Sequence, residues 1–368
     1  MLSNRYYLGD LITQRREKNP GGDLPIRGVS KNGLQPPKQI DADTSIYNLY
    51  YRHDFIYNPA RMELGSIAFN DEYDRAICSS LYEVFYVHRE DLVIPEYLAL
   101  FVKHPEFARY CNYLGNGSAR EYCRFDNISS IAISLPSIQE QKRIVREFRI
   151  ITDRINLLRR INEKYSEVMD AVYTNWFVQY QPFDYQIPSD WYEGRVEDIA
   201  EFYDYLRRPL SGEEREGMQK LYPYYGAISI VDYVDDYIFD GSFVLLSEDG
   251  ANILDDKGHP ALQFIHGKVW VNNHAHVLKA QNGFSNASLY VFLSHMQMQA
   301  IVTGAAQPKI NQENLRSFPV VIPSPSVLKE FNKIIDPFFS QITTNNDEID
   351  SLQKLVELLS NQMARSVM

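Results

Sequence analysis

Apolar residues recur at steps of three and four along two long stretches of the chain. In the first, over about 139–177, they stand at 144, 148, 151, 155, 158, 161, 165, 168, 172 and 176; in the second, over about 326–366, they stand at 331, 335, 338, 342, 349, 352, 355, 359 and 363. This spacing places a narrow apolar stripe on one face of a helix. Pro136 and Pro182 flank the first stretch, as helix start and stop signals do. The pattern predicts two long helices.

A helix of about 40 residues is roughly 60 Å long. Either each helix lies along its own domain, or the two helices pair with each other. We favour pairing, because the stripe is longer than one domain can cover, and a two-fold relation makes the helices antiparallel. Pro337 and the polar patch 343–346 predict a kink or a weaker contact in the second helix. The residues expected to pair are Ile144, Phe148, Ile151, Ile155, Tyr165, Val168, Val172, Trp176, Phe331, Ile335, Phe338, Ile342, Leu352, Leu355 and Leu359.

The chain repeats itself with a period of 187 residues. The stretch 120–137 aligns with 307–324, so that Asn127 falls on Asn314, and the register continues into both helices without a gap. So long a period indicates two copies of a domain followed by a helix, not a short solenoid. We expect domains at 1–134 and 187–321, and helices at 135–186 and 322–368.

The segments before each helix mix two patterns. The stretches 76–87, 241–246 and 268–278 are typical of strands, whereas 94–102 and 287–299 are typical of helices. The predicted fold class is α+β: two similar α+β domains separated by two long antiparallel helices that form a coiled coil, related by a pseudo-two-fold internal repeat.

Composition is typical of a soluble globular protein, with 45% hydrophobic and 23% charged residues. No apolar run approaches the roughly 20 residues that span a bilayer, and the N-terminal stretch lacks the apolar core of a signal peptide. Three cysteines without CxxC spacing favour reduced thiols in a cytoplasmic protein. The net charge of −11 opposes DNA binding at first sight, but the acidic excess is concentrated in residues 187–320.

The stretch Leu135–Val145, LPSIQEQKRIV, resembles a signature of the specificity subunits of type I restriction–modification enzymes. In that family a small-residue turn, an apolar strand and a Pro precede a Gln-Glu-Gln-basic-basic-Ile helix start. The second half is similar to the family through Tyr224–Ala227, Asp236–Gly241, Glu248–Ala251 and Asn272–Val277. The segment Pro325–Glu330 departs from the pattern, since it lacks the Gln-Glu-Gln run.

The resemblance implies that each domain, a target-recognition domain, reads one half of a split, asymmetric site on double-stranded DNA. The helices would act as a ruler of at most about 18 base pairs. Two methyltransferase subunits would dock on the helical region and two restriction subunits would join them, with no membrane involved. Adenine-N6 methylation and ATP-dependent cleavage, with their S-adenosylmethionine, ATP and Mg, would belong to these partners. This chain would hold no cofactor and be non-catalytic.

No recognisable catalytic motif contradicts the interpretation that this chain is non-catalytic. The chain contains neither GxGxxG nor GxxxxGK[ST], and Asn58–Arg61 lacks the second Pro and the aromatic residue of an adenine methyltransferase tetrapeptide. His274 and His276 could share one face of a strand as metal ligands, but no Cys or HExxH supports a metal site. The acidic pairs 235–236, 248–249 and 255–256 could suggest a nuclease, although such runs are usually solvated surface.

DNA contacts are expected from polar and basic residues in segments rich in turns, because loops carry function. Arg can read guanine, and Asn or Gln can read adenine. The candidates are Arg27, Ser30, Lys31, Asn32, Arg120 and Tyr122 in the first domain, and Arg207, Arg208, Lys220, Tyr225, His274, Gln307 and Lys309 in the second.

Three other functions stay open. The twin domains could form a protein-interaction scaffold that binds no DNA, which the acidic second half would suit. The chain could be a stand-alone enzyme with an unrecognised site. It could also serve a related restriction class with a fused methyltransferase–nuclease. Salt-sensitive, specific DNA binding would distinguish the first of these from a specificity subunit.

Overall fold

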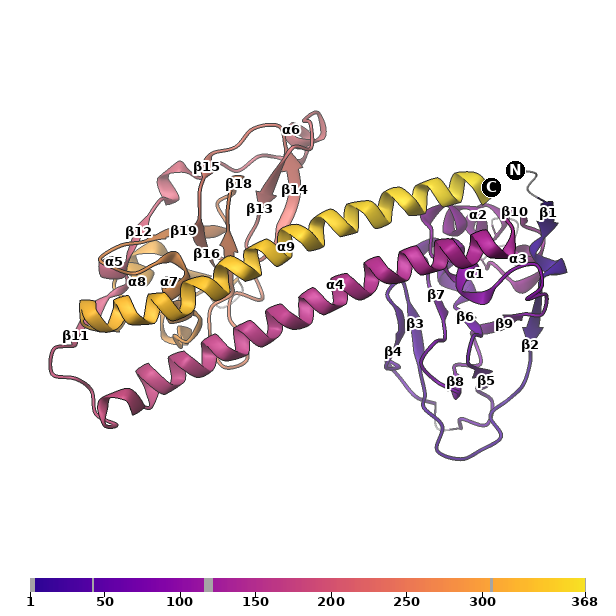
Figure 1. Cartoon of the computed structure of the whole chain (residues 1–368), viewed down its shortest axis with the longest axis horizontal. Coiled ribbons are helices and arrows are strands. Elements are labelled where there is room, and N and C mark those ends of the chain that lie inside the picture. Colours follow the sequence, from indigo (N-terminus) through magenta and orange to yellow (C-terminus); the bar gives the residue numbers. More distant parts are fainter. Residues whose placement is uncertain (1–3, 42, 116–121, 305–306, 368) are drawn as a thin grey trace. The chain divides into compact units, whose positions relative to one another are not determined.

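The computed structural model describes residues 4–41, 43–115, 122–304 and 307–367. The chain divides into two units: Met1–Leu157 with Ile349–Met368 form unit 1, and Leu158–Glu348 form unit 2. Each contains strands, short helices and part of both long helices, α4 (Ile138–Tyr173) and α9 (Pro325–Val367) (Figure 1). The expected α+β class is confirmed.

Each unit has an antiparallel four-stranded sheet at its centre, and the two sheets have the same strand order. In unit 1 the order is β2 (Ile12–Arg15), β9 (Glu83–Val87), β6 (Phe55–Tyr57) and β7 (Ile67–Phe69). In unit 2 it is β12 (Ala200–Phe202), β19 (Ala275–Ala280), β16 (Phe243–Ser247) and β17 (Leu262–Ile265). The internal repeat therefore extends to topology.

A two-stranded ladder joins the start of each unit to the strand before its long helix. In unit 1 β1 (Asn4–Tyr7) pairs with β10 (Ala132–Leu135). In unit 2 β11 (Tyr192–Arg195) pairs with β22 (Pro319–Ile322). Because α4 and α9 follow β10 and β22 directly, these ladders fix where each helix leaves its unit.

The units differ in their remaining strands. Unit 1 has the hairpin β3 (Gly28–Ser30) and β4 (Gly33–Gln35), and the pair β5 (Asn48–Tyr51) and β8 (Arg75–Cys78). Unit 2 has a second sheet ordered β14 (Ile230–Val234), β13 (Tyr222–Tyr225), β18 (Lys268–Val271) and β15 (Phe239–Asp240), and the pair β20 (Val302–Thr303) and β21 (Lys309–Ile310). The stretches 76–87 and 268–278 each contain two strands.

Short helices cover these sheets. Unit 1 contains α1 (Pro95–Val102), α2 (Pro105–Gly115) and α3 (Phe125–Ser129), and unit 2 contains α5 (Val196–Ile199), α6 (Gly212–Glu216), α7 (Asn286–Ser294) and α8 (Gln312–Arg316). The stretches 94–102 and 287–299 therefore form helices as predicted, although α7 ends at Ser294. Among the described residues, no helix is long and apolar enough to cross a membrane.

Both long helices contribute to both cores. In unit 1, Met363 and Val367 of α9 are buried with Phe85 and Phe101, and Ile144 of α4 packs against them. In unit 2, Met169 of α4 is buried together with Phe331 and Ile335 of α9. Full burial of one such side chain contributes about 1.5–3 kcal/mol. The beginning of one helix therefore meets the end of the other within each unit, so the paired segments run antiparallel.

The apolar stripe expected on the two long helices has the correct period, but the prediction is wrong at two of its positions. The rings of Tyr165 and Phe338 lie 5.3 Å apart, as helix pairing requires. Val168 and Leu355, however, are 43% and 40% exposed, while Met169 is buried. Between residues 165 and 172, an apolar residue at 168 or at 169 gives steps of three and four in either order. The spacing alone could therefore not distinguish Val168 from Met169.

The polar patch of the second helix does not weaken its contact with the first. Asn345 is buried, and its Nδ2 donates to Asn162 Oδ1 at 2.7 Å. Asn162 Nδ2 in turn donates to Asn346 Oδ1 at 2.9 Å. A polar residue buried in a helix pair favours the register in which it finds its partner. The patch therefore specifies the alignment of α4 and α9 within unit 2.

Candidate nucleic-acid interface

The first candidate contacts lie on the β3–β4 hairpin of unit 1. Lys31 and Asn32 are exposed at its turn, where the Asn32 amide donates to Ser30 Oγ at 3.2 Å. Gly33 completes the turn with a φ of 99°, which a residue with a side chain rarely adopts. The turn thus presents one cation and one amide side chain to solvent on a defined backbone.

Arg27 borders a groove of about 410 Å³ beside this hairpin. Its guanidinium lies over the Tyr73 ring and its Nε donates to Tyr73 Oη at 2.8 Å, so the side chain is held in place. Lys38 and Arg61, both exposed, line the same groove together with Asp41. The charge pattern of the sequence did not single out Lys38 or Arg61, because only tertiary structure places them with Arg27.

The Asn58–Arg61 segment has a structural role. Asn58 Oδ1 accepts the Ala60 amide at 3.1 Å and caps the 3-10 helix η2 (Pro59–Leu64), which carries Arg61. The Pro59 carbonyl accepts the Cys123 amide at 3.0 Å, which brings the candidate Tyr122 next to η2. The Arg124 guanidinium lies 5.7 Å from the Tyr122 ring centroid. Arg120 lies outside the described residues.

In unit 2 several candidates meet around Glu248 at the end of β16. Arg207 Nη1 contacts Glu248 Oε2 at 2.6 Å, and Lys309 Nζ contacts Glu248 Oε1 at 2.9 Å. The Arg207 side chain is only 13% exposed, which leaves little of it for a DNA base, whereas Lys309 is 47% exposed. His274 Nδ1 lies 2.7 Å from Asp249 Oδ1.

Gln307 is exposed close to this cluster, because the adjacent Pro308 carbonyl accepts the Gly250 amide at 3.2 Å. The structure therefore brings together Arg207, His274, Gln307 and Lys309.

The remaining candidates of unit 2 lie along its second sheet. The Tyr225 carbonyl accepts the Asn272 amide, and the Arg208 amide donates to the Val271 carbonyl, so both residues border the segment that leads to His274. Lys220 precedes β13 at the opposite end of that strand, where it forms an ion pair with Asp232 at 3.0 Å. Lys220 is therefore not part of the cluster around Glu248.

Asp204, Glu248 and His276 have potential ligand atoms within 4.8 Å of one another. Burial alone would raise the pKa of Asp204, but the hydrogen bond from His276 and the charges of His276 and Arg207 lower it. Burial would also raise the pKa of Glu248, but the hydrogen bonds from Lys309 and Arg207 lower it. Two cations already neutralise these carboxylates, so the cluster suits an ion-pair network better than a metal ion.

Paired carboxylates also disfavour the nuclease interpretation. Glu248 and Asp249 contact Arg207, Lys309 and His274, and Asp255 contacts His259 at 3.1 Å. Such internal pairing also reduces the acidic charge that unit 2 presents to a polyanion. Residues 187–320 should therefore repel DNA less strongly than their count of acidic residues suggests.

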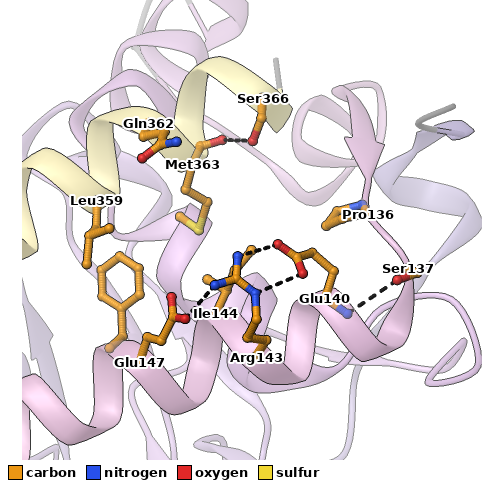
Figure 2. A pocket seen from close by; sticks show the side chains of 11 residues that line it. Pro136, Ser137, Glu140, Arg143, Ile144, Glu147, Leu359, Gln362, Met363 and Ser366 are labelled. Atoms are coloured by element: carbon orange, nitrogen blue, oxygen red, sulfur yellow. Dashed lines mark hydrogen bonds and ion pairs between the residues drawn. The ribbon is translucent and has the colours of Figure 1, made fainter. Parts of the chain in front are cut away.

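A second surface lies in unit 1 where α4 begins. A groove of about 660 Å³ runs between α4 and the last turns of α9 (Figure 2). Its apolar lining residues are Pro136, Ile144, Phe148, Leu359 and Met363. Its polar edge on α4 carries Arg143, which forms ion pairs with Glu140 and Glu147. We call this surface the helix-start groove.

Gln141, the second Gln of the family-like signature, is completely buried beside the groove. Its Oε1 accepts the Ile94 amide at 3.0 Å, and its Nε2 donates to the Leu92 and Pro136 carbonyls at 2.8 and 2.9 Å. One side chain thus satisfies three backbone groups that would otherwise be buried without partners. This explains physically why a Gln follows the Pro at this distance.

The chain is similar to proteins of one family. A family model described as the type I restriction modification DNA specificity domain matches residues 9–165 and again residues 188–354. A putative type I restriction enzyme specificity subunit of Haemophilus influenzae is 34% identical over 141 residues, 38% of this chain and 35% of that protein. The chain thus spans about a third of the length of that relative.

Two further comparisons extend over more of the chain. The type I restriction enzyme MjaIX specificity subunit of Methanocaldococcus jannaschii is 20% identical over 300 residues, 73% of this chain and 68% of that protein. The crystal structure of a type I restriction–modification system S subunit from M. genitalium matches with a TM-score of 0.61 and 14% identity, over 98% of this chain and 95% of that one. The latter likeness concerns the fold alone.

Proposed function

Because this chain belongs to the type I restriction–modification DNA specificity family, we propose that it is the DNA-reading subunit of such an enzyme. Each unit reads one half of a split site on double-stranded DNA in the cytoplasm, and the two halves differ in sequence. The observation that carries this proposal is the repeated fold: each unit has the same central sheet, and each presents its own exposed basic and amide side chains from segments outside that sheet.

In unit 1 the proposed DNA surface consists of the β3–β4 turn and the adjacent groove. Lys38 and Arg61 are suited to phosphate contacts, because both are exposed cations beside the immobilised guanidinium of Arg27. The exposed amide of Asn32 can pair with the N6 and N7 atoms of adenine. Phosphate contacts then position the unit, and the hairpin turn reads base edges.

In unit 2 the proposed contacts are Gln307, Lys309 and His274, which lie beside Glu248 and Asp249. Gln307 offers the same amide chemistry as Asn32. Arg207 supports this surface from inside through its ion pairs with Asp204 and Glu248. The two units therefore use different side chains on different segments around a similar central sheet, which would account for an asymmetric site.

We also propose that methyltransferase subunits dock on the helical region, with the helix-start groove as one contact, and that restriction subunits join the assembly. The groove is lined by the apolar side chains of Ile144, Phe148 and Leu359 and edged by charged side chains, a combination typical of protein interfaces. Adenine methylation and ATP-dependent cleavage, with S-adenosylmethionine, ATP and Mg, are assigned to these partners. The chain itself performs no reaction.

Methylation sequencing of the host genome with and without this gene tests the proposal. We expect methyladenine at one split motif to disappear when the gene is deleted. The motif would report both half-sites and the unread spacer, which we attribute to the paired helices. If an intact, expressed partner methyltransferase leaves every motif unchanged after deletion, the DNA-reading function is wrong, and pull-down experiments should then test the scaffold function.

A further inference from the structure

Glu83 and His276 occupy equivalent positions in the two central sheets. In unit 1 Ile12 pairs with Val87 and Tyr57 with Glu83, and in unit 2 Ala200 pairs with Ala280 and Leu246 with His276. Val87 and Ala280 are the last residues of β9 and β19, and Glu83 and His276 each stand four residues before them. The period of 187 does not reveal this match, because it places His276 on residue 89.

Both residues bind the segment that enters a short helix after the candidate DNA contacts. Asn127 of α3 and Asn314 of α8, aligned by the repeat, donate from Nδ2 to the Leu114 and Ile301 carbonyls, each at 3.2 Å. The segments before α3 and α8 are therefore equivalent in structure. They carry Tyr122 in unit 1 and Lys309 in unit 2.

Glu83 acts only as an acceptor. Its Oε2 accepts the Phe125 amide at 2.8 Å, the Tyr57 hydroxyl at 2.7 Å and Gln14 Nε2 at 3.4 Å. Tyr57 is fully buried, and burial together with the charge of Glu83 raises its pKa, so the hydroxyl remains a donor. Three donors therefore converge on one oxygen of Glu83, one of them from the backbone of the segment that follows Tyr122.

His276 links the same segment of unit 2 to the rest of the central sheet. It is fully buried, with Nδ1 2.6 Å from Asp204 Oδ2 and Nε2 2.9 Å from the Ile310 carbonyl oxygen. Asp204 also accepts from the Val277 amide and from Gln312 Nε2. The ring therefore joins the Asp204 carboxylate to the backbone of the segment that carries Lys309.

His276 is also connected to the candidate contact Lys309 through Glu248. Glu248 Oε2 lies 3.8 Å from His276 Nδ1, and Arg207 and Lys309 contact Glu248 in turn. A side chain that cannot reach both Asp204 and the Ile310 carbonyl at this buried position would leave buried polar groups without partners and the Lys309 segment without this support.

We propose, on the basis of the function proposed above, that Glu83 and His276 are positioning residues for the DNA contacts of units 1 and 2. Glu83 holds the segment that carries Tyr122 through the Phe125 amide, and His276 holds the segment that carries Lys309 through the Ile310 carbonyl. Each residue therefore supports recognition of one half-site only.

The test uses the full chain with its methyltransferase partners and duplexes in which one half of the methylated motif is altered at a time. Discrimination against each altered half is measured separately for each variant. We expect His276→Gln to reduce discrimination at one half-site about tenfold, and Glu83→Gln to do so at the other. His266→Gln and Glu90→Gln, changes at exposed positions of units 2 and 1, are the matched controls.

Lys309→Ala, a change at an exposed position, should lower discrimination at the same half as His276→Gln, so the proposal stays testable even if a variant of a buried residue does not fold. Equal losses at both halves in every variant, or a Lys309→Ala loss at the half that Glu83→Gln affects, would overturn it. If the unsubstituted complex shows no sequence preference, the proposed function fails instead.

Discussion

The first turns of α4 and α9 occupy equivalent places in the two units but have different neighbours. Ile144 lines the open helix-start groove of unit 1 beside Met363 (Figure 2). At the corresponding positions of unit 2 stand Phe331 and Trp176, whose rings lie 5.9 Å apart. Phe177 also contacts Phe331, with the ring centroids 4.8 Å apart. The same fold thus leaves one helix start accessible and fills the other with its own aromatic side chains.

The aromatic filling comes from the segment that follows α4. After the π-helix η3 (Thr174–Val178), Phe183 and Trp191 pack against each other with ring centroids 5.2 Å apart. Trp191 also contacts Phe177. A partner could therefore bind the exposed apolar groove of unit 1, whereas in unit 2 it would have to displace this packing.

The largest expected difference concerns core packing at the two helix starts. Phe331→Ala should lower the free energy of unfolding by about 3–5 kcal/mol, because the ring is fully buried among other rings. Phe148→Ala should cost less, about 2 kcal/mol, since the groove already leaves part of its ring without packing partners. Urea unfolding of the full chain measures both. Equal losses would show that the groove is closed in solution.

The next largest effect is expected from exchanging the residues that differ at equivalent positions of the two helix starts. Gln141→Leu introduces the residue found at the equivalent Leu328, and should cost about 2–3 kcal/mol by leaving buried backbone groups without partners. Leu328→Gln should be similarly destabilising, because Leu328 is 2% exposed in an apolar core. Thermal unfolding measures both, with Gln139→Leu, the same exchange at an exposed position of the helix start, as control. A tolerated Gln141→Leu would mean that Gln141 serves partner binding instead.

A smaller effect concerns phosphate contacts. Replacing both Lys38 and Arg61 by Ala should reduce the slope of log affinity against log salt by about two, and Lys309→Ala by at most about one, because each phosphate contact contributes roughly one counterion. Lys309 is already paired with Glu248, which limits its contribution. Titrations at several salt concentrations measure these slopes, with the exposed Lys103→Ala as control. An unchanged slope in the double variant would remove the unit 1 groove from the interface.

The smallest effect is a difference in acid sensitivity between the units. In unit 2 the pKa values of Asp204 and Glu248 are lowered, so their stabilising contribution is present above the unfolded value of about 4 and is lost as the pH falls below it. In unit 1 burial raises the pKa of Asp54 in spite of its hydrogen bond from Arg15. Its contribution is therefore greatest at low pH and declines as the pH rises through the raised pKa.

Acid should consequently open unit 2 before unit 1. Hydrogen exchange of β16 and β19, compared with β6 and β9 after correction for intrinsic rates, measures the difference. Asp204→Asn should flatten the pH dependence of unit 2 alone. Earlier opening of unit 1 would show that other carboxylates dominate.

Periodic features of the chain were predictable because they are local. Steps of three and four specify a helix wherever it packs, and the matching of Asn127 with Asn314 predicted a repeat whose two members make the same hydrogen bond. Contacts across tens of residues were not predictable. Lys38 and Arg61 join Arg27 only through folding, and the preference for Met169 over Val168 depends on where α9 lies.

The sequence by itself determined the α+β class, the two long helices, the repeat and the family. These properties depend on side-chain periodicity and on residues that are neighbours along the chain. Only the tertiary structure decided that His276 and Glu83 occupy equivalent positions behind the candidate DNA contacts. Their hydrogen-bonding partners, such as Asp204 and Ile310 for His276, are distant in sequence and meet them only in the folded unit.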